Sequence, residues 1–296
     1  MGANPQARAR DLNAAFADPD IRAVLATVGG EDQITVVPHL DPAPVRADPK
    51  PFLGYSDNAN ILSWLWTQGV AGFYGGSTQV HFGPGPAVDR CHADALRAAL
   101  LTGERLEVTD PGESQDFGRD WADPAALTEY AERASTQPRN WAGPARAVTG
   151  RSWGGCIEVI QWILTAGRFP ADPAVLAGAV LLLETSEDVI PAPEFGWILR
   201  SLGERGVLAA VAAVLVARPR RRTSSSDPWP RNGRPTVLSS TTPPSNWSAG
   251  TTPTPSSASA CPSDTPDHSG SCPTAARSPS MAPSTRSGPT TAESIP

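Results

Sequence analysis

The sequence predicts an α/β fold, and three observations support this prediction. Short apolar runs alternate with helical patterns from residue 7 to residue 76, which is typical of parallel strands joined by helices. A second alternation between residues 146 and 218 indicates a smaller, incomplete C-terminal domain. Ser, Thr and Pro occupy 45 of the 78 positions in 219–296, so this stretch cannot bury enough apolar surface to fold and should be a disordered tail.

The N-terminal α/β domain is assigned to residues 1–86. Its apolar residues have helical spacing before the breaker Asp18-Pro19, and compact branched runs such as IRAVLATV have the length of buried strands. We expect, in order, a helix at 7–16, a strand at 21–28, a loop with one short helical turn at 38–49, a strand at 50–55, a helix at 58–67 and a strand at 72–76.

Residues 87–145 are expected to connect the two domains or to cap a cleft between them. An amphipathic helix at 88–101 begins this segment, and a polar stretch rich in Trp, Pro and Asp follows it. For the C-terminal domain, residues 146–218, we expect a strand at 148–155, a helix at 156–164, a strand at 179–183, a helix at 193–202 and an apolar segment at 207–216.

Composition and charge exclude several classes of protein. With 24 basic and 30 acidic residues the net charge is −6, which argues against a general nucleic-acid binder. The basic cluster at Arg218 and 220–222 is better explained as a solvated charge run, with nucleic-acid contact by the tail as the alternative. No run of 18 apolar residues and no apolar signal core occur, so we expect a cytoplasmic protein without a membrane span.

The four cysteines predict neither a disulfide framework nor a zinc site, because no C-x-x-C pair exists. Cys91 and Cys156 are expected to act as small buried hydrophobes in a reducing compartment, and Cys261 and Cys272 belong to the tail.

Three stretches contain residues that could carry chemistry. Ser56, in Gly54-Tyr55-Ser56-Asp57, lies at a strand-to-helix turn where a serine can act as a nucleophile, although Ser-Asp is also an ordinary helix N-cap. Gly29-Gly30 ends another strand and could expose backbone N–H groups for an oxyanion hole, or could be a simple turn. Glu184 ends a strongly apolar strand, either half-buried beside a basic partner or already in solvent.

Taken together, these stretches resemble the LD-carboxypeptidase family of serine peptidases, which includes the microcin C immunity proteins. The matching text is ARDLNAAFADPDIRAVLATVGGEDQ, KPFLGYSDNANIL, GFYGG, TGRSWGG and VLLLETSED, from residue 7 to about residue 217. The resemblance implies that Ser56 is the nucleophile and that the N–H groups of Gly30 and Asp57 form the oxyanion hole. It also implies that Glu184 orients the catalytic histidine, and LLLETSED is closer to the microcin-immunity branch.

Two departures from the family pattern affect this interpretation. Members of the family have about one further strand and helix before the segment that begins here at residue 7, so the first strand is expected to be missing. The family histidine lies in a late G-H-T-x-P motif, and none of His39, His81, His92 and His268 has that context.

The missing histidine motif can be found in another reading frame of the tail. Residues 263–276 (SDTPDHSGSCPTAA), back-translated with permitted codons and read from the third base of the first codon, give GHTRPQWILPYGG, which resembles the motif and its following strand. We infer a frameshift near residues 218–222. A genuine mucin-like linker would also fit the composition, but it does not explain the hidden motif.

The resemblance implies hydrolysis of an amide bond in cell-wall peptides or in microcin-like peptide-nucleotides, without a metal or organic cofactor. The expected partner is a small peptide or peptide-nucleotide substrate, and a second copy in a homodimer is a further candidate; no nucleic acid and no membrane are expected. Loss of the histidine predicts impaired catalysis. The alternative is a non-catalytic remnant of the same fold that binds a ligand.

Overall fold

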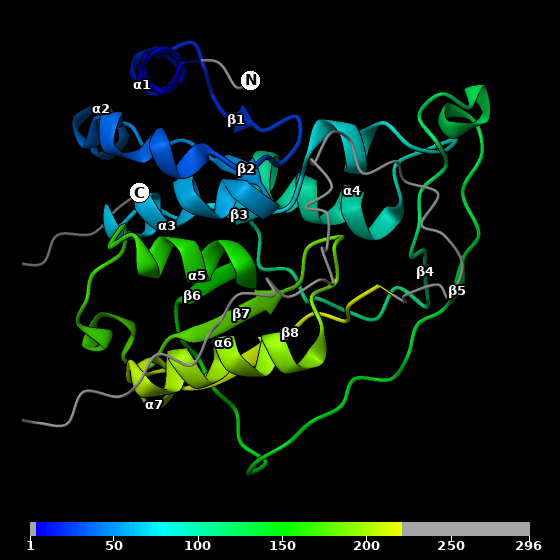
Figure 1. Cartoon of the computed structure of the whole chain (residues 1–296). Helices are drawn as coiled ribbons and strands as arrows, with labels where there is room; N and C mark the ends of the chain where they lie inside the picture. Colours follow the sequence, from blue (N-terminus) through cyan, green and yellow to red (C-terminus); the bar gives the residue numbers. More distant parts are fainter. Residues whose placement is uncertain (1–3, 221–296) are drawn as a thin grey trace, which may run out of the picture. The chain divides into compact units, whose positions relative to one another are not determined.

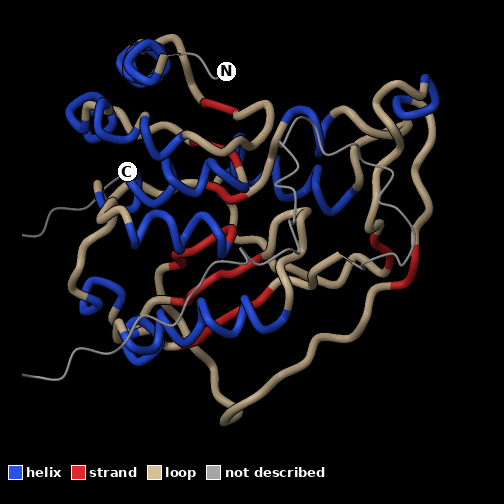
Figure 2. Tube along the Cα trace, viewed as in Figure 1, coloured by secondary structure: helices blue, strands red, loops and turns tan. Residues whose placement is uncertain are grey.

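The computed structural model describes residues 4–220, which contain two small parallel sheets (Figures 1 and 2). The first sheet has the order β1-β2-β3, formed by Val24–Leu25, Phe52–Gly54 and Phe73–Tyr74. The second has the order β6-β7-β8, formed by Ser152–Cys156, Val180–Glu184 and Ala213–Val216. This mixed α/β architecture with parallel strands confirms the predicted fold class. Residues 221–296 lie outside the described part of the chain. They include His268 and nearly all of the tail for which disorder was expected.

The helices around the first sheet follow the predicted pattern. Helix α1, Pro5–Ala17, begins at Asn4, whose side chain accepts hydrogen bonds from the next two free N–H groups of the chain, and Pro5 occupies the first helical position. A short helix, α2 (Pro42–Ala47), occupies the loop where one helical turn was expected. Helix α3, Ala59–Thr67, packs its buried face into a core with α1, α2 and β2, and the buried members of this core are Phe16, Val45, Phe52, Ile61, Leu65 and Val70.

The segment between the two sheets contains little regular structure. Helix α4, Arg90–Arg97, continues into a π-helical turn at Ala98–Thr102, which together match the predicted helix. Beyond it the chain makes only a two-residue antiparallel pair, β4 (Glu113–Ser114) with β5 (Ala134–Ser135), and a 3-10 turn at Pro124–Leu127.

The larger core surrounds the second sheet. Helix α5, Ile157–Thr165, buries Ile157, Ile160 and Ile163 against β6 and β7. Helix α6, Ala192–Glu204, contributes Ile198 and Leu202, and α7, Val207–Ala210, contributes Val207. Helix α3 contacts both α5 and β6, so the same helix that leads away from the β2 turn also packs on the second sheet. Because the strands of each sheet are parallel, the residues after β1, β2 and β3 gather at one edge, and Glu184 ends β7.

Candidate active site

Ser56 stands directly after β2 in a strained backbone conformation. Its φ is +57°, one of only two positive values among non-glycine residues in the described part of the chain. The left-handed region is unfavourable for side chains with a Cβ atom, and such strain persists only where the surrounding structure imposes it. A 3-10 turn, Ser56–Asn58, then leads into α3. The residue thus occupies a sharp strand-to-helix turn, the geometry in which a nucleophilic serine is presented.

The glycine pair after β1 lies against this turn. A Cβ atom added to Gly29 would stand 2.8 Å from the Ser56 Cβ and 2.9 Å from its Oγ, while one added to Gly30 would stand 3.1 Å from Asp57 Oδ2. Gly29, which the resemblance did not single out, is therefore the glycine that touches the serine, and Gly30 lies beside the following aspartate. Only residues without a Cβ allow the backbone to approach this closely.

Two buried polar side chains fasten the glycine loop to the turn. The Asp57 carboxylate accepts hydrogen bonds from the Gln33 backbone N–H and from Asn60 Nδ2, both at 2.9 Å, and burial raises the pKa of this carboxyl. Asn58 Nδ2 donates to the Val28 carbonyl, and Asn58 Oδ1 accepts from Gln33 Nε2 at 2.7 Å. Sequence reasoning assigned Asp57 only a backbone role. The structure adds a side-chain role in positioning residues 28–33.

Tyr74, at the end of β3, joins the serine to the glutamate. Its hydroxyl oxygen accepts the Ser56 backbone N–H at 2.9 Å, and its O–H donates to Glu184 Oε1 at 2.5 Å. The ring fits because residue 155 is a glycine with φ +141°. A Cβ there would lie 2.6 Å from Tyr74 Cε2. Sequence analysis gave Tyr74 no role, although an aromatic residue at the end of the third strand of a parallel sheet, inside GFYGG, was the available signal.

The pKa values of both side chains in this bridge, Glu184 and Tyr74, are raised. Burial, followed by repulsion from Glu158 and Glu187, raises the pKa of Glu184 to about 7, and the hydrogen bond from Tyr74 opposes this rise. Burial and the nearby glutamate raise the pKa of the Tyr74 hydroxyl far above its ordinary value of 10. Tyr74 therefore remains a hydrogen-bond donor at neutral pH and cannot serve as the base, whereas Glu184 is poised between its two forms.

The histidines do not complete a triad among residues 4–220. His81 stacks edge-on against His92 at 5.0 Å and against Tyr55 at 5.7 Å, and burial lowers its pKa. His39 is exposed at the end of a 3-10 turn, as expected for a loop residue. None of the three has a hydrogen bond to Ser56 or Glu184 in this part of the chain.

Cysteine and metal chemistry add no alternative centre to the described part. Cys156 and Cys91 are both free thiols, the first buried as expected and the second exposed, which corrects the expectation that Cys91 is a buried hydrophobe. The exposure follows from its place near the start of α4, a helix with no buried residue between Arg90 and Arg97. Within residues 4–220, no group of three or more His, Cys, Asp and Glu side chains is placed to bind a metal ion. No helix in this part is long and apolar enough to cross a membrane.

Comparison with protein families matches two segments of the chain. Residues 1–75 match the LD-carboxypeptidase N-terminal domain and residues 149–240 match the LD-carboxypeptidase C-terminal domain. Ser56, Gly30, Asp57 and Glu184 all lie inside these matches. The second match extends beyond residues 218–222, where the frameshift was inferred.

Two curated relatives each align with about seven tenths of the chain. A Vibrio cholerae protein with a carboxypeptidase name is 28% identical over 214 residues, which cover 71% of this chain and 61% of the relative. The microcin C7 self-immunity protein MccF of Escherichia coli is 26% identical over 216 residues, covering 71% and 60%. The chain thus spans about three fifths of the length of these relatives.

Solved structures show the same fold. MccF in complex with glutamyl sulfamoyl guanosine aligns with a TM-score of 0.62 at 22% identity, covering 74% of this chain and 64% of that one. An MccF-like protein from Bacillus anthracis aligns with a TM-score of 0.61 at 20% identity and the same coverage.

Proposed function

This chain belongs to the LD-carboxypeptidase family, and on that premise we propose that it is a serine-type amidohydrolase whose nucleophile is Ser56. The observation that carries the proposal is the strained φ of +57° at Ser56, pressed against Gly29 and bridged through Tyr74 to Glu184. Strain of this kind is costly, about 1–3 kcal/mol, and is typical of catalytic turns.

In the proposed reaction, Ser56 Oγ attacks the carbonyl carbon of the scissile amide while a base removes its proton. The backbone N–H groups of Gly30 and Asp57 would stabilise the oxyanion. In support of this role, Asp57 directly follows Ser56, and Gly30 lies beside the Asp57 side chain. The tetrahedral intermediate then expels the amine, which takes a proton from the same base, and water hydrolyses the resulting ester. Glu184 would orient the base and stabilise its protonated form.

The base itself is the part of the machinery that residues 4–220 do not supply. We propose that the G-H-T motif encoded in the shifted frame of residues 263–276 once provided it, and that the chain as written is impaired. Without a base a serine hydroxyl is a poor nucleophile, and loss of the histidine in serine hydrolases costs on the order of a million-fold in turnover.

For the substrate we propose a small peptide or peptide-nucleotide with an amide near its carboxyl end. MccF, which shares the fold, has been solved with glutamyl sulfamoyl guanosine and with aspartyl sulfamoyl adenosine, and this supports the peptide-nucleotide class. The two free thiols support a reducing compartment, and we propose the cytoplasm.

The test compares five proteins on an L,D-peptide and on aspartyl sulfamoyl adenosine. They are the chain as written, its Ser56→Ala variant, its frame-restored form, and the restored form carrying Ser56→Ala or Ser201→Ala. Ser201 is an exposed serine on α6 and controls for hydroxyl loss. Turnover is expected in the restored form and its Ser201→Ala variant only. Robust turnover by the chain as written, abolished by Ser56→Ala, would show that another group is the base. Turnover that survives Ser56→Ala would exclude the serine mechanism.

A non-catalytic ligand-binding protein is the second candidate. The observation in its favour is that the Glu184 Oε1 atom already accepts a hydrogen bond from Tyr74, so the site is ordered without a histidine. Tight binding of aspartyl sulfamoyl adenosine by the chain as written, with no turnover in the restored form, would favour this candidate.

A further inference from the structure

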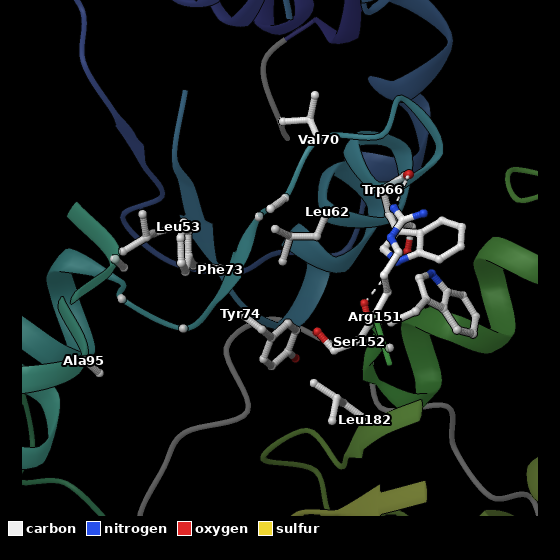
Figure 3. Close-up of a pocket in the computed structure, with 18 of the residues that line it drawn as sticks. Leu53, Leu62, Trp66, Val70, Phe73, Tyr74, Ala95, Arg151, Ser152 and Leu182 are labelled. Atoms are coloured by element: carbon white, nitrogen blue, oxygen red, sulfur yellow. Dashed lines mark hydrogen bonds between the residues drawn. The ribbon is translucent and has the colours of Figure 1, made fainter. Parts of the chain in front are cut away.

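The molecule contains a cavity of about 620 Å³ between α3, β3, α4 and the start of β6 (Figure 3). Neither Ser56 nor Glu184 lines it. Its volume is within the range of small-molecule sites. Much of the wall is apolar, and the side chains that make it so include Leu53, Leu62, Trp66, Phe73 and Leu182.

Three polar atoms on the lining residues have no hydrogen-bond partner in the described part of the chain. They are Ser63 Oγ, His81 Nδ1 and Trp153 Nε1. Ser63 and Trp153 are only 1% and 4% exposed. Leaving a buried polar group unpaired costs about 1–3 kcal/mol, and folded proteins nearly always provide a partner. The indole N–H can only donate, so its partner must be an acceptor.

Arg151 adds a positive charge to the same wall. Its guanidinium lies over the Trp66 ring, 4.1 Å from the centroid, and donates to the Trp66 carbonyl at 3.3 Å (Figure 3). No carboxylate within residues 4–220 forms an ion pair with it. Arg151 directly precedes β6 and Trp153 lies within it, so both donor side chains come from one short segment and both line the cavity. A guanidinium with unused N–H groups is the preferred protein partner of a planar carboxylate.

We propose that this cavity binds a small aromatic carboxylate. The ring would pack on the apolar wall and the carboxylate would accept hydrogen bonds from Arg151 and Trp153. Water alone could form hydrogen bonds with the polar atoms, but it would leave the apolar wall without a favourable contact, because apolar cavities are poorly hydrated. Tyr74, which hydrogen-bonds the Ser56 backbone N–H and Glu184, also lines the cavity, but Ser56 and Glu184 do not. The proposed ligand contacts use neither the Ser56 hydroxyl nor a base, so the inference does not depend on hydrolysis by Ser56.

The test measures binding of 2-naphthoate and of the neutral isostere 2-naphthamide to the full chain by isothermal titration calorimetry. We expect the acid to bind at least tenfold more tightly than the amide. Arg151→Ala should remove that preference and leave amide binding unchanged, Arg151→Lys should keep part of it, and Trp153→Phe should weaken the acid several-fold. Arg10→Ala, which removes an exposed arginine on α1, is the control and should change nothing.

Several results would overturn the proposal. Equal affinity for acid and amide, a preference that persists in Arg151→Ala, or no binding of either compound at millimolar concentration each contradicts it. Near-ultraviolet circular dichroism verifies that every variant is folded. Ser56→Ala should bind 2-naphthoate like the parent chain, so a failure of the hydrolase proposal would leave this result unchanged.

Discussion

Replacing Glu184 with Gln probes the half-buried carboxylate at the end of β7. Its pKa is about 7 in the folded protein, against an ordinary value of 4.5, chiefly because burial disfavours its charged form. A carboxyl whose pKa is higher in the folded than in the unfolded protein binds more protons when folded. Its contribution to the free energy of unfolding is therefore complete below about pH 4.5 and is lost as the pH rises through 7.

The size of this effect follows from the two pKa values. One pKa unit corresponds to about 1.4 kcal/mol, so the difference between 4.5 and about 7 is worth roughly 3 kcal/mol. Glu184→Gln cannot ionise and should not show this loss. Between pH 4.5 and pH 8 the parent chain should lose about 3 kcal/mol relative to the variant, and most of the change should fall between pH 5 and pH 7.5.

The assay is urea unfolding followed by tryptophan fluorescence in steps of half a pH unit. Glu204→Gln serves as the matched control, because Glu204 is an exposed carboxylate at the end of α6. Its stability curve should run parallel to that of the parent. If the Glu184→Gln curve also runs parallel to the parent curve within about 0.5 kcal/mol, the buried, Tyr74-bonded environment assigned to Glu184 is wrong.

Three further substitutions test the contacts that hold the site and the N-terminal core. Tyr74→Phe removes the hydrogen bond that lowers the pKa of Glu184. Because hydrogen bonds to charged groups are worth about 1.5–3 kcal/mol, the midpoint of the pH–stability curve should rise by about one to two pH units. An unchanged midpoint would contradict the hydrogen bond from Tyr74 to Glu184. Gly29→Ala forces a Cβ atom to within 2.8 Å of the Ser56 Cβ and should cost about 1–3 kcal/mol in urea unfolding, whereas a neutral result would mean that the loop is not packed there. Lys50→Met removes a buried ammonium that donates to a backbone carbonyl of α1 at 2.5 Å. Because that carbonyl then has no partner, the free energy of unfolding should fall by about 1–3 kcal/mol. Equal or higher stability would show that this hydrogen bond does not stabilise the fold.

The elements that sequence reasoning located well are those with dense apolar patterns. The run VLLLE became β7, which pairs with a strand on each side and buries Leu181 and Leu183. The stripe after Cys156 became α5, whose ends differ from the predicted ones by one residue. In both cases the pattern itself determines which face is buried, so no information from distant residues is required.

Two segments have a different secondary structure from the predicted one, because neighbouring elements rather than the local sequence pattern determine it. The run 21–28 forms only the two-residue strand β1, since its neighbour β2 is three residues long and offers partners to Val24 and Leu25 alone. The apolar segment 207–216 divides into the short helix α7 and strand β8, and periodicity alone cannot separate a buried helical turn from a strand over so few residues.

The sequence signal at Tyr74, an aromatic residue inside GFYGG, does not identify its role, because its hydrogen-bond partners are 18 and 110 residues away. Sequence patterns give the strand ends at which Ser56 and Glu184 lie, but not which third side chain spans them. The same holds for Lys50, which lies in a strand candidate yet buries its ammonium beneath α1. Long-range polar contacts of this kind depend on the packing of both sheets and have no local signature.

If the proposed frame-restored form supplies a histidine, the bridge also bears on how that histidine would act. A carboxylate has two oxygens and about four lone-pair directions, and Tyr74 uses Oε1 of Glu184. A histidine could therefore donate to the carboxylate without displacing the tyrosine. Tyr74 hydrogen-bonds both the Ser56 backbone N–H and Glu184 within residues 4–220, so the turn that carries the proposed nucleophile is linked to the carboxylate without the proposed base. Restoring the base should then require only that it dock onto an existing arrangement, and Tyr74→Phe in the restored form should lower turnover even though Tyr74 carries no proton in the reaction.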